Sequence, residues 1–426
     1  MTLEQQVASL NDNVGNLVLK SNELTKSIED KLKEYEDWKN SISSDNPVIL
    51  QIGPDKEFKH PVDAAKHIEE NDRLTGDILW KLKIDIGIYE FPYQGIHSLT
   101  FSHNKNVQII GNSENISDVV FRYIGNERLY MIIAERNSHI EVRNISFTGI
   151  TQFTSTFVIQ IHDKSLREGM AGGGLAHGIL ARYNSSAIIE DCNFYRLWRA
   201  IHCHDNCKMD IANITGSELH GGVYCNSNSK IYISRSSIQG AGVSNNPSTS
   251  SWSALAAHHA STIFCYGVDC RNFHMGLYAH WSSDFHFHRA HDYDADGITQ
   301  INIKDGHVEN CYHAFHIHHA SGGNINNTLI KGIHSHAIIS GQSSNVHAGH
   351  NVRVDGADIG YYAIHQSVIG ANSSSAKNCR GIGYSSRHKS EIHAHSTSTR
   401  LGGNKTNYSP GTSHALGNYD AYIYRS

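Results

Sequence analysis

Histidine is the residue type through which this chain could do most of its chemistry. The sequence holds 31 histidines in 426 residues, and 24 of them lie at or after His202. An imidazole ring can gain a proton near neutral pH, bind a transition metal, or present a flat ring with a polar edge. Five His-x-His pairs indicate that the placement is not random: 202/204, 286/288, 316/318, 334/336 and 393/395.

Eight histidine and tyrosine positions fall into two columns when the sequence is stacked by an internal repeat of about 22 residues. Residues i, i+2 and i+4 of a strand share a face, so both columns should point outward from a sheet. The first column contains His202, Tyr224, Tyr278 and His316, and the second contains His204, His258, His280 and His318. We take these eight as candidate binding residues.

A separate motif could hold calcium. Asp292, Asp294 and Asp296 precede a glycine in the order Asp-x-Asp-x-Asp-Gly, the first half of a calcium-binding loop. The motif departs from the full pattern because the twelfth position is Ile303, and Asp305 could replace the missing ligand only on a different loop path. A solvated acidic turn is the alternative.

Candidates for acid–base catalysis are few. Glu190 and Asp210 are acids on successive repeats that should face outward together. Two carboxylates about 5 to 9 Å apart could cleave a glycosidic bond. However, Arg143 should stack beside Glu190, so a surface ion pair explains the same residues. The sequence contains no nucleophile-elbow, zinc-protease or phosphate-loop motif.

The elements that would position these residues are short, repeated strands. Units such as Gly178–Arg182, Ala200–His204 and Gly222–Asn226 share a small–apolar–x–small–x pattern, and a second strand in each repeat usually opens with serine. Units of 20 to 25 residues without helices cannot bury an apolar face alone and must stack on one another. The pattern predicts an all-β protein, a right-handed parallel β-helix solenoid. A β-propeller would need about 40 to 50 residues per blade.

The N-terminal 45 residues follow a different period. Apolar residues recur every 3.5 positions, for example Leu3, Val7, Leu10 and Val14, which predicts an α-helical coiled-coil stem over residues 1–45. A single amphipathic helix packed on its own domain is the alternative. The complete prediction is a stem at 1–45, a cap and first coils at 46–150, a histidine-rich β-helix at 151–405 and a closing segment at 406–426.

Three segments carry a family resemblance: Val62–Ile68, Lys83–Phe91 with its Gly-x-Tyr strand, and Val107–Gly111. Together they resemble the start of pectate-lyase-like right-handed β-helices, in which a helix caps the solenoid. With the coiled coil and the Ser/Asn/His-rich coils, the chain resembles bacteriophage tailspikes and tail fibres. That resemblance implies a homotrimeric virion tail appendage that is assembled in the host cytoplasm. Its stem would contact other tail proteins, and its surface would bind a host cell-surface glycan.

Several interpretations of the outward columns remain open: a glycan-binding face, a subunit interface, a transition-metal site on the His-x-His ladders, or simple stacking. The alternative function is a tailspike depolymerase, either a polysaccharide lyase or an endoglycosidase that cleaves capsule or lipopolysaccharide.

A net charge of −5 argues against nucleic-acid binding. No apolar run is long enough to insert into a membrane. The eight cysteines should be free and buried, and titration of the imidazoles should change assembly or adsorption between pH 7.5 and 5.5.

Overall fold

The computed structural model describes most of the chain from residue 47 onward. The described residues are Lys20, Lys26, 47–71, 78–96, 98–125, 129–149, 176–243, 251–293, 300–395, 401–410 and 422–424. The predicted coiled-coil stem at 1–45 therefore lies outside the described residues, apart from two lysines. Among the helices that are described, none is long and apolar enough to cross a membrane.

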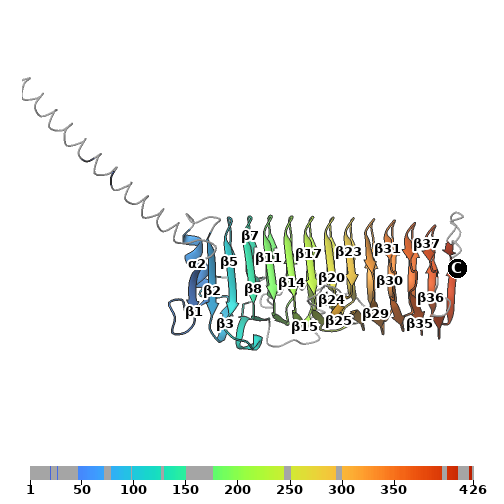
Figure 1. Cartoon of the computed structure of the whole chain (residues 1–426), viewed down its shortest axis with the longest axis horizontal. Helices are drawn as coiled ribbons and strands as arrows, with labels where there is room; N and C mark the ends of the chain where they lie inside the picture. The colour runs from blue at the N-terminus through green and yellow to red at the C-terminus, as the bar shows by residue number, and fades with distance from the viewer. Residues whose placement is uncertain are drawn as a thin grey trace, which may run out of the picture.

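The described chain folds into three long parallel sheets that wind around one axis (Figure 1). The first sheet contains β1 (Val48–Ile52), β2 (Leu79–Ile84), β5 (Asn106–Gly111), β8 (His139–Arg143), β11 (Ser186–Glu190), β14 (Lys208–Ala212), β17 (Lys230–Ser234), β20 (Thr262–Tyr266), β23 (Asp284–His288), β28 (Gly322–Ile325), β31 (Asn345–His347), β34 (Val368–Gly370), β37 (Glu391–His393) and β40 (Tyr422–Tyr424). The second sheet contains β3 (Gly87–Phe91), β6 (Val119–Tyr123), β9 (Ser146–Thr148), β12 (Asn193–Tyr195), β15 (Thr215–Leu219), β18 (Ser237–Gly240), β21 (Asp269–Arg271), β26 (Gly306–Glu309), β29 (Thr328–Lys331), β32 (Arg353–Asp355), β35 (Ser375–Lys377) and β38 (Leu401–Gly402). The third sheet contains β4 (Leu99–Phe101), β7 (Leu129–Glu135), β10 (Ala176–Arg182), β13 (Arg199–Cys203), β16 (Gly221–Asn226), β19 (Ser253–His258), β22 (Met275–His280), β27 (His313–Ile317), β30 (His336–Gly341), β33 (Ile359–Ile364), β36 (Ile382–Ser386) and β39 (Thr406–Pro410).

Each coil runs from the third sheet to the first, then to the second, and back to the third one step further along the axis. The predicted parallel β-helix is confirmed, because nearly all strands pair in parallel with the equivalent strand of the next coil. A propeller would require separate blades of mostly antiparallel strands. One antiparallel hairpin, β24 (Ala290–Tyr293) with β25 (Gln300–Lys304), is inserted between β23 and β26.

The first coil is covered by a short helix, α2 (Pro61–Glu70), at the N-terminal end of the solenoid (Figure 1). His60 caps the helix by accepting a hydrogen bond from the backbone N–H of Val62, and Pro61 occupies the first turn. The helix buries Val62 and Ile68 and packs against β1, β2 and β4. It shields the apolar end of the stack from water, as the resemblance implied.

The corners of the coil use left-handed backbone conformations. Between the third and first sheets, two consecutive residues have positive φ, as in Tyr183 (56°) and Asn184 (61°). The next residue is usually a buried serine whose hydroxyl accepts the backbone N–H of the same position one coil earlier. Ser229 thus donates its N–H to Ser261, and Ser261 donates its own to Ser283, at 3.2 and 3.3 Å. The serine that opens the second strand of each repeat therefore builds a buried hydrogen-bonded ladder.

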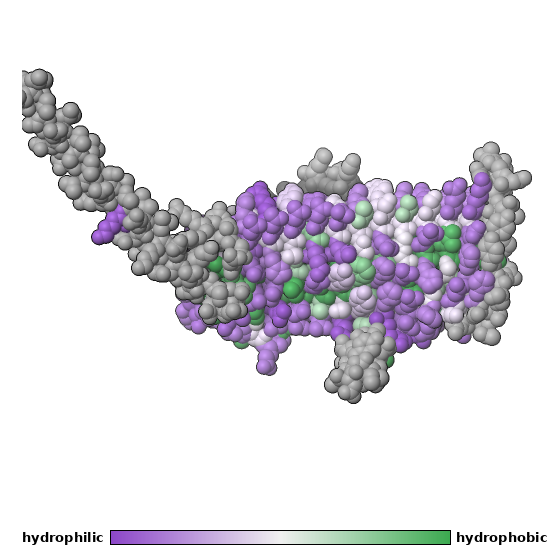
Figure 2. Space-filling view, turned by 45° about the horizontal axis from the view of Figure 1, so that its top comes forward, coloured by the Kyte–Doolittle hydropathy of each residue, from purple (hydrophilic) through white to green (hydrophobic). Residues whose placement is uncertain are grey.

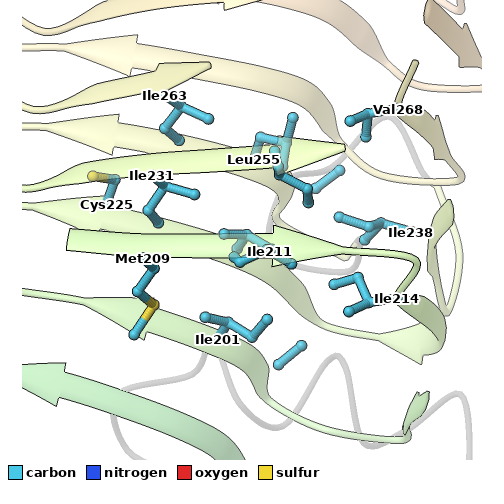
Figure 3. Close-up of a cluster of buried hydrophobic side chains, with 14 of the residues drawn as sticks. Ile201, Met209, Ile211, Ile214, Cys225, Ile231, Ile238, Leu255, Ile263 and Val268 are labelled. Carbon is cyan, nitrogen blue, oxygen red and sulfur yellow. The ribbon is translucent and has the colours of Figure 1, made fainter. Parts of the chain in front are cut away.

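The interior is filled by equivalent apolar side chains of successive coils. Ile201, Leu255, Ile231 and Ile263 point into the same space between the sheets (Figure 3). Close packing explains the glycine at one of the small positions of the repeat, since a Cβ at Gly222 would collide with the carbonyl oxygen of Ala254. All eight cysteines are buried and free, as predicted.

One part of the inside–outside prediction is wrong. Tyrosine was expected to face outward, yet Tyr361 and Tyr384 are completely buried in the core. Their rings stack 4.7 Å apart, in the core column that runs from Phe315 through Ile338. The core tolerates them because the Tyr361 hydroxyl donates a hydrogen bond to the backbone oxygen of Ser375 at 3.4 Å.

Candidate functional site

The outer face of the third sheet brings the eight predicted binding residues together. The strand register aligns His202 with Tyr224, and Tyr278 with His316. His258 pairs with His280 in the neighbouring column. With two further histidines, they form what we call the third-sheet array: His202, His204, Tyr224, His258, Tyr278, His280, His313, His316, His318 and His336.

Outward orientation does not mean exposure in this array. The exposed fractions of His202, Tyr224 and His280 are only 8%, 6% and 8%. The rings cover one another: His258 lies 5.2 Å from Tyr278, and Tyr278 lies 5.5 Å from His316, between ring centroids. An aromatic ring is wider than the distance between neighbouring strands, so each ring packs against the rings of the adjacent coils. The outer face of the third sheet therefore becomes a continuous aromatic layer.

Burial keeps the most enclosed imidazoles of this layer neutral. Together with smaller contributions from neighbouring imidazoles, it lowers the pKa of His258 and His280 to about 4 and that of His313 to about 3. Burial also lowers the pKa of His336 to about 4, although the carboxylate of Asp358 opposes this shift. The pKa of His316 lies well below its usual value for the same reason. In the native state, His258, His280 and His336 therefore titrate near pH 4, below the range of pH 7.5 to 5.5 in which the sequence predicted a change.

Three ring nitrogens of the array are enclosed within the layer. Within the described chain, the Nδ1 atoms of His280, His313 and His316 are buried and have no hydrogen-bond partner. A neutral imidazole can either donate or accept at such an atom, according to its tautomer. Because these atoms are buried, a ligand would instead meet the partly exposed rings of His258, Tyr278 and His318, whose apolar faces and polar edges suit a ligand that alternates C–H surfaces and hydroxyl groups.

A second row of aromatic residues borders the array, and the sequence analysis missed it. We call it the corner row: Trp198, His220, Trp252, His274 and Tyr312. Trp198 stacks on His220 at 3.8 Å, and His274 stacks on Tyr312 at 4.7 Å. These residues recur with the same spacing as the array, directly before each strand of the third sheet, so the same stacking of repeats could have found them.

A smaller aromatic stack lies on the first sheet. Tyr232, Phe264 and His286 follow one another with nearly parallel rings, 4.7 and 4.6 Å between centroids. Lys230 lies over both Tyr232 and Phe264, at 5.8 and 5.4 Å from the ring centres. This first-sheet stack offers a matched aromatic surface on another face of the same solenoid.

The two catalytic candidates, Glu190 and Asp210, form ion pairs with basic side chains on the first sheet. Arg143 contacts Glu190 at 3.2 Å, and Lys208 contacts Asp210 at 2.9 Å. The register pairs Glu190 with Ala212 and Asp210 with Ile188, so the two acids are diagonal neighbours rather than members of one column. Surface ion pairs account for both residues.

A tighter group of acids and bases lies on the second sheet. Asp269 and Arg271 of β21 are adjacent to His307 and Glu309 of β26, and we call these four residues the second-sheet cluster. His307 Nδ1 lies 3.2 Å from Asp269, and Arg271 lies 3.1 Å from Glu309. Although burial opposes it, hydrogen bonds from His307 and Arg271 lower the pKa of Asp269. This cluster was not predicted from the sequence, because its two halves lie on different coils and are 36 or more residues apart.

The predicted calcium motif lies largely outside the described residues. Asp292 belongs to β24 and pairs through its backbone with Ile301, whereas Asp294 and Asp296 are not described. Asp305, considered above as a substitute ligand, is instead paired with Arg289 at 2.7 Å and Arg353 at 3.2 Å. Across the described ranges, no three His, Cys, Asp or Glu side chains are grouped to hold a metal ion.

Comparison with known proteins gives structural similarity without sequence similarity. No protein-family model and no curated protein sequence matches the chain. The A-module of the mannuronan C-5 epimerase AlgE4 of Azotobacter vinelandii is similar over 86% of this chain and 94% of its own, with 10% identity and a TM-score of 0.38. The catalytic domain of a GH87 α-1,3-glucanase covers 86% of this chain and 66% of its own, with 8% identity and a TM-score of 0.42. ORF18 of Geobacillus virus E2 covers 79% and 54%, with 10% identity and a TM-score of 0.33.

Proposed function

We propose that this protein is a virion tail appendage, a tail fibre or tailspike, whose third-sheet array binds a host cell-surface glycan. The observation that carries the proposal is the continuous layer of aromatic rings on the outer face of the third sheet, in which His258, Tyr278 and His318 are partly exposed. Sugar rings have apolar C–H faces and many hydroxyls, and this layer offers partners for both. A β-helix also holds the rings rigidly, so little conformational entropy is lost on binding.

The assembly of the proposed appendage follows from the same interpretation. Residues 1–45 would form a homotrimeric coiled coil that contacts other virion tail proteins, after assembly in the host cytoplasm. Light scattering on the full chain and on a chain lacking residues 1–45 tests this, with a trimer expected only for the full chain. Elemental analysis of the same sample tests for Ca²⁺ at Asp292–Asp296 and for a transition metal on the His-x-His ladders.

The glycan proposal is tested by binding of the full chain to an array of bacterial capsular polysaccharides and lipopolysaccharides. Tyr278→Ala removes a ring from the middle of the third-sheet array, and we expect it to weaken binding at least about tenfold. Tyr232→Ala, which removes a ring from the first-sheet stack, is the matched control and should bind like the wild type. The proposal fails if no polysaccharide binds or if Tyr278→Ala binds normally.

The second candidate function is a depolymerase, a polysaccharide lyase or endoglycosidase, and the second-sheet cluster favours it. Asp269 and Glu309 place two carboxylates beside one imidazole, which is a combination that can donate and accept protons. The test is the release of reducing ends or unsaturated products from any polysaccharide that binds. Loss of this activity in Glu309→Gln would support the cluster, and loss in Glu190→Gln or Asp210→Asn would support the first-sheet acids. If the polysaccharide stayed intact after prolonged incubation, the depolymerase function would be excluded and adhesion would be the remaining function.

A further inference from the structure

The corner between the third and first sheets contains a groove of about 510 Å³ over four successive coils. It is lined by the paired turn residues of these coils, including His319, Gln342, His365, His388 and Lys389. We propose that this turn groove binds an acidic glycan, a chain of sugars that carry carboxylate groups. The inference rests on the proposed function in that the ligand is a glycan, but it assigns a site with a different lining from the third-sheet array, which it adjoins where His319 packs on His280 at 4.1 Å.

The backbone of these turns does not require the side chains that it carries. Each turn is held by hydrogen bonds between coils, as from the N–H of Ser343 to the carbonyl of His365 at 2.9 Å. Both turn residues have positive φ, for example 52° at Gln342 and 62° at Gln366. Asparagine tolerates this conformation better than glutamine or lysine, and earlier coils indeed use asparagine, as at Asn206. The backbone conformation of the later turns therefore does not dictate their long polar side chains.

The lining of the groove is rich in hydrogen-bond donors and contains no carboxylate. Three imidazoles, two carboxamides and the ammonium group of Lys389 face it. His365 and His388 also stack, with ring centroids 4.9 Å apart, and so offer an apolar surface to a sugar ring. The nearest acid along the chain, Glu391, is already hydrogen-bonded to His393 at 3.2 Å. The ammonium group of Lys389, together with the N–H donors of the imidazoles and carboxamides, complements an anion.

The length of the groove also fits an extended ligand. Four coils at a strand spacing of about 4.8 Å span about 14 Å, the length of a short oligosaccharide. Because every coil repeats the same backbone, the donors are arranged at regular intervals along the axis, as the charges of a regular acidic polysaccharide are. A single small anion would use only one of the four turns.

The test uses isothermal titration of the full chain with tetragalacturonic acid, with neutral maltotetraose as the comparison ligand. The double variant His365→Asn/His388→Asn removes two imidazoles with a residue that the turn accepts, and Lys389→Gln removes the positive charge. We expect the wild type to bind the acidic tetrasaccharide, and each variant to bind it at least about tenfold more weakly. His103→Asn is the matched control, since His103 occupies the same turn position on an early coil outside the groove. Melting curves establish that the variants fold.

The outcomes separate this inference from the proposed function. Failure of the acidic tetrasaccharide to bind, or equal binding by wild type and the groove variants, overturns the turn groove and leaves the third-sheet array untouched. Binding that is lost in Tyr278→Ala but kept in the groove variants assigns the acidic ligand to the array and also overturns the groove. Binding that is lost only in the groove variants, with no bacterial polysaccharide depending on Tyr278, supports the groove and overturns the proposed role of the array.

Discussion

The Nε2 atoms of His316 and His318 lie 2.6 Å apart, on two residues that point to the same side of the third sheet. At this distance one ring donates its N–H and the other accepts it, so the accepting nitrogen must carry no proton. Burial lowers the pKa of both rings, and this favours the neutral forms that the contact requires. The pair shows how a surface crowded with imidazoles remains stable: the rings behave as neutral hydrogen-bonding partners and not as repelling cations.

This arrangement predicts a loss of stability in mildly acidic solution. The imidazoles of His258 and His280 have a pKa of 6.5 in the unfolded chain and of about 4 in the folded protein. Between these two pH values the unfolded chain therefore binds more protons than the folded protein. The free energy of unfolding is therefore greatest above pH 6.5 and falls progressively towards pH 4. We expect the melting temperature to be lower at pH 5 than at pH 7.5 by roughly 5 °C or more.

The variant His258→Asn should reduce this pH dependence, because Asn226 occupies the equivalent position one coil earlier and does not titrate. Scanning calorimetry from pH 7.5 to 4.5 measures both proteins. A wild-type melting temperature that stays constant over this range would contradict the linkage of these rings to folding.

The serine ladder predicts that a single hydroxyl contributes measurably to stability. Ser261→Ala leaves the buried N–H of Ser229 without its acceptor, and an unsatisfied buried donor costs about 1 to 3 kcal/mol. Ser282→Ala is the matched control, because the same turn position already holds alanine at Ala260 and Ala320. Urea unfolding should therefore separate the two variants, and equal stability would show that water or backbone relaxation replaces the lost acceptor.

Much of this architecture could be predicted because the structural repeat is visible in the sequence as a repeated pattern of residue types. Alternation with period 2 assigns each side chain to one face, and the 22-residue step then aligns His202 with Tyr224 as the structure does. The identity of opening residues such as Ser229 was visible as well, although its role as an acceptor between coils was not.

The parts that sequence could not supply depend on lateral contacts between strands and coils. Tyr224 faces outward as predicted, but its burial comes from the rings around it and from Arg199, 4.2 Å above its ring centre. The second-sheet cluster joins Asp269 to His307 across the inserted hairpin, so sequence spacing conceals their contact. The turn groove was equally invisible, since its lining consists of isolated turn residues on separate coils.

The two adjacent tyrosines of β33 provide a direct test of which side chains face the core. Tyr361 is fully buried and stacks on Tyr384, whereas Tyr362 faces outward, stacks on His336 and lies 5.9 Å from Arg387. We expect Tyr361→Ala to lower the free energy of unfolding by about 3 to 5 kcal/mol, since it removes a large ring and leaves a cavity. Tyr361→Phe keeps the stack and loses only the hydrogen bond to Ser375, which costs about 0.5 to 1.5 kcal/mol. Tyr362→Ala should cost about 1 kcal/mol or less, as expected for a residue outside the core. Denaturant unfolding of the three variants measures this order. If Tyr362→Ala were the most damaging, the alternation of the strand would be shifted by one residue, and the outward columns of every neighbouring coil would have to be reassigned.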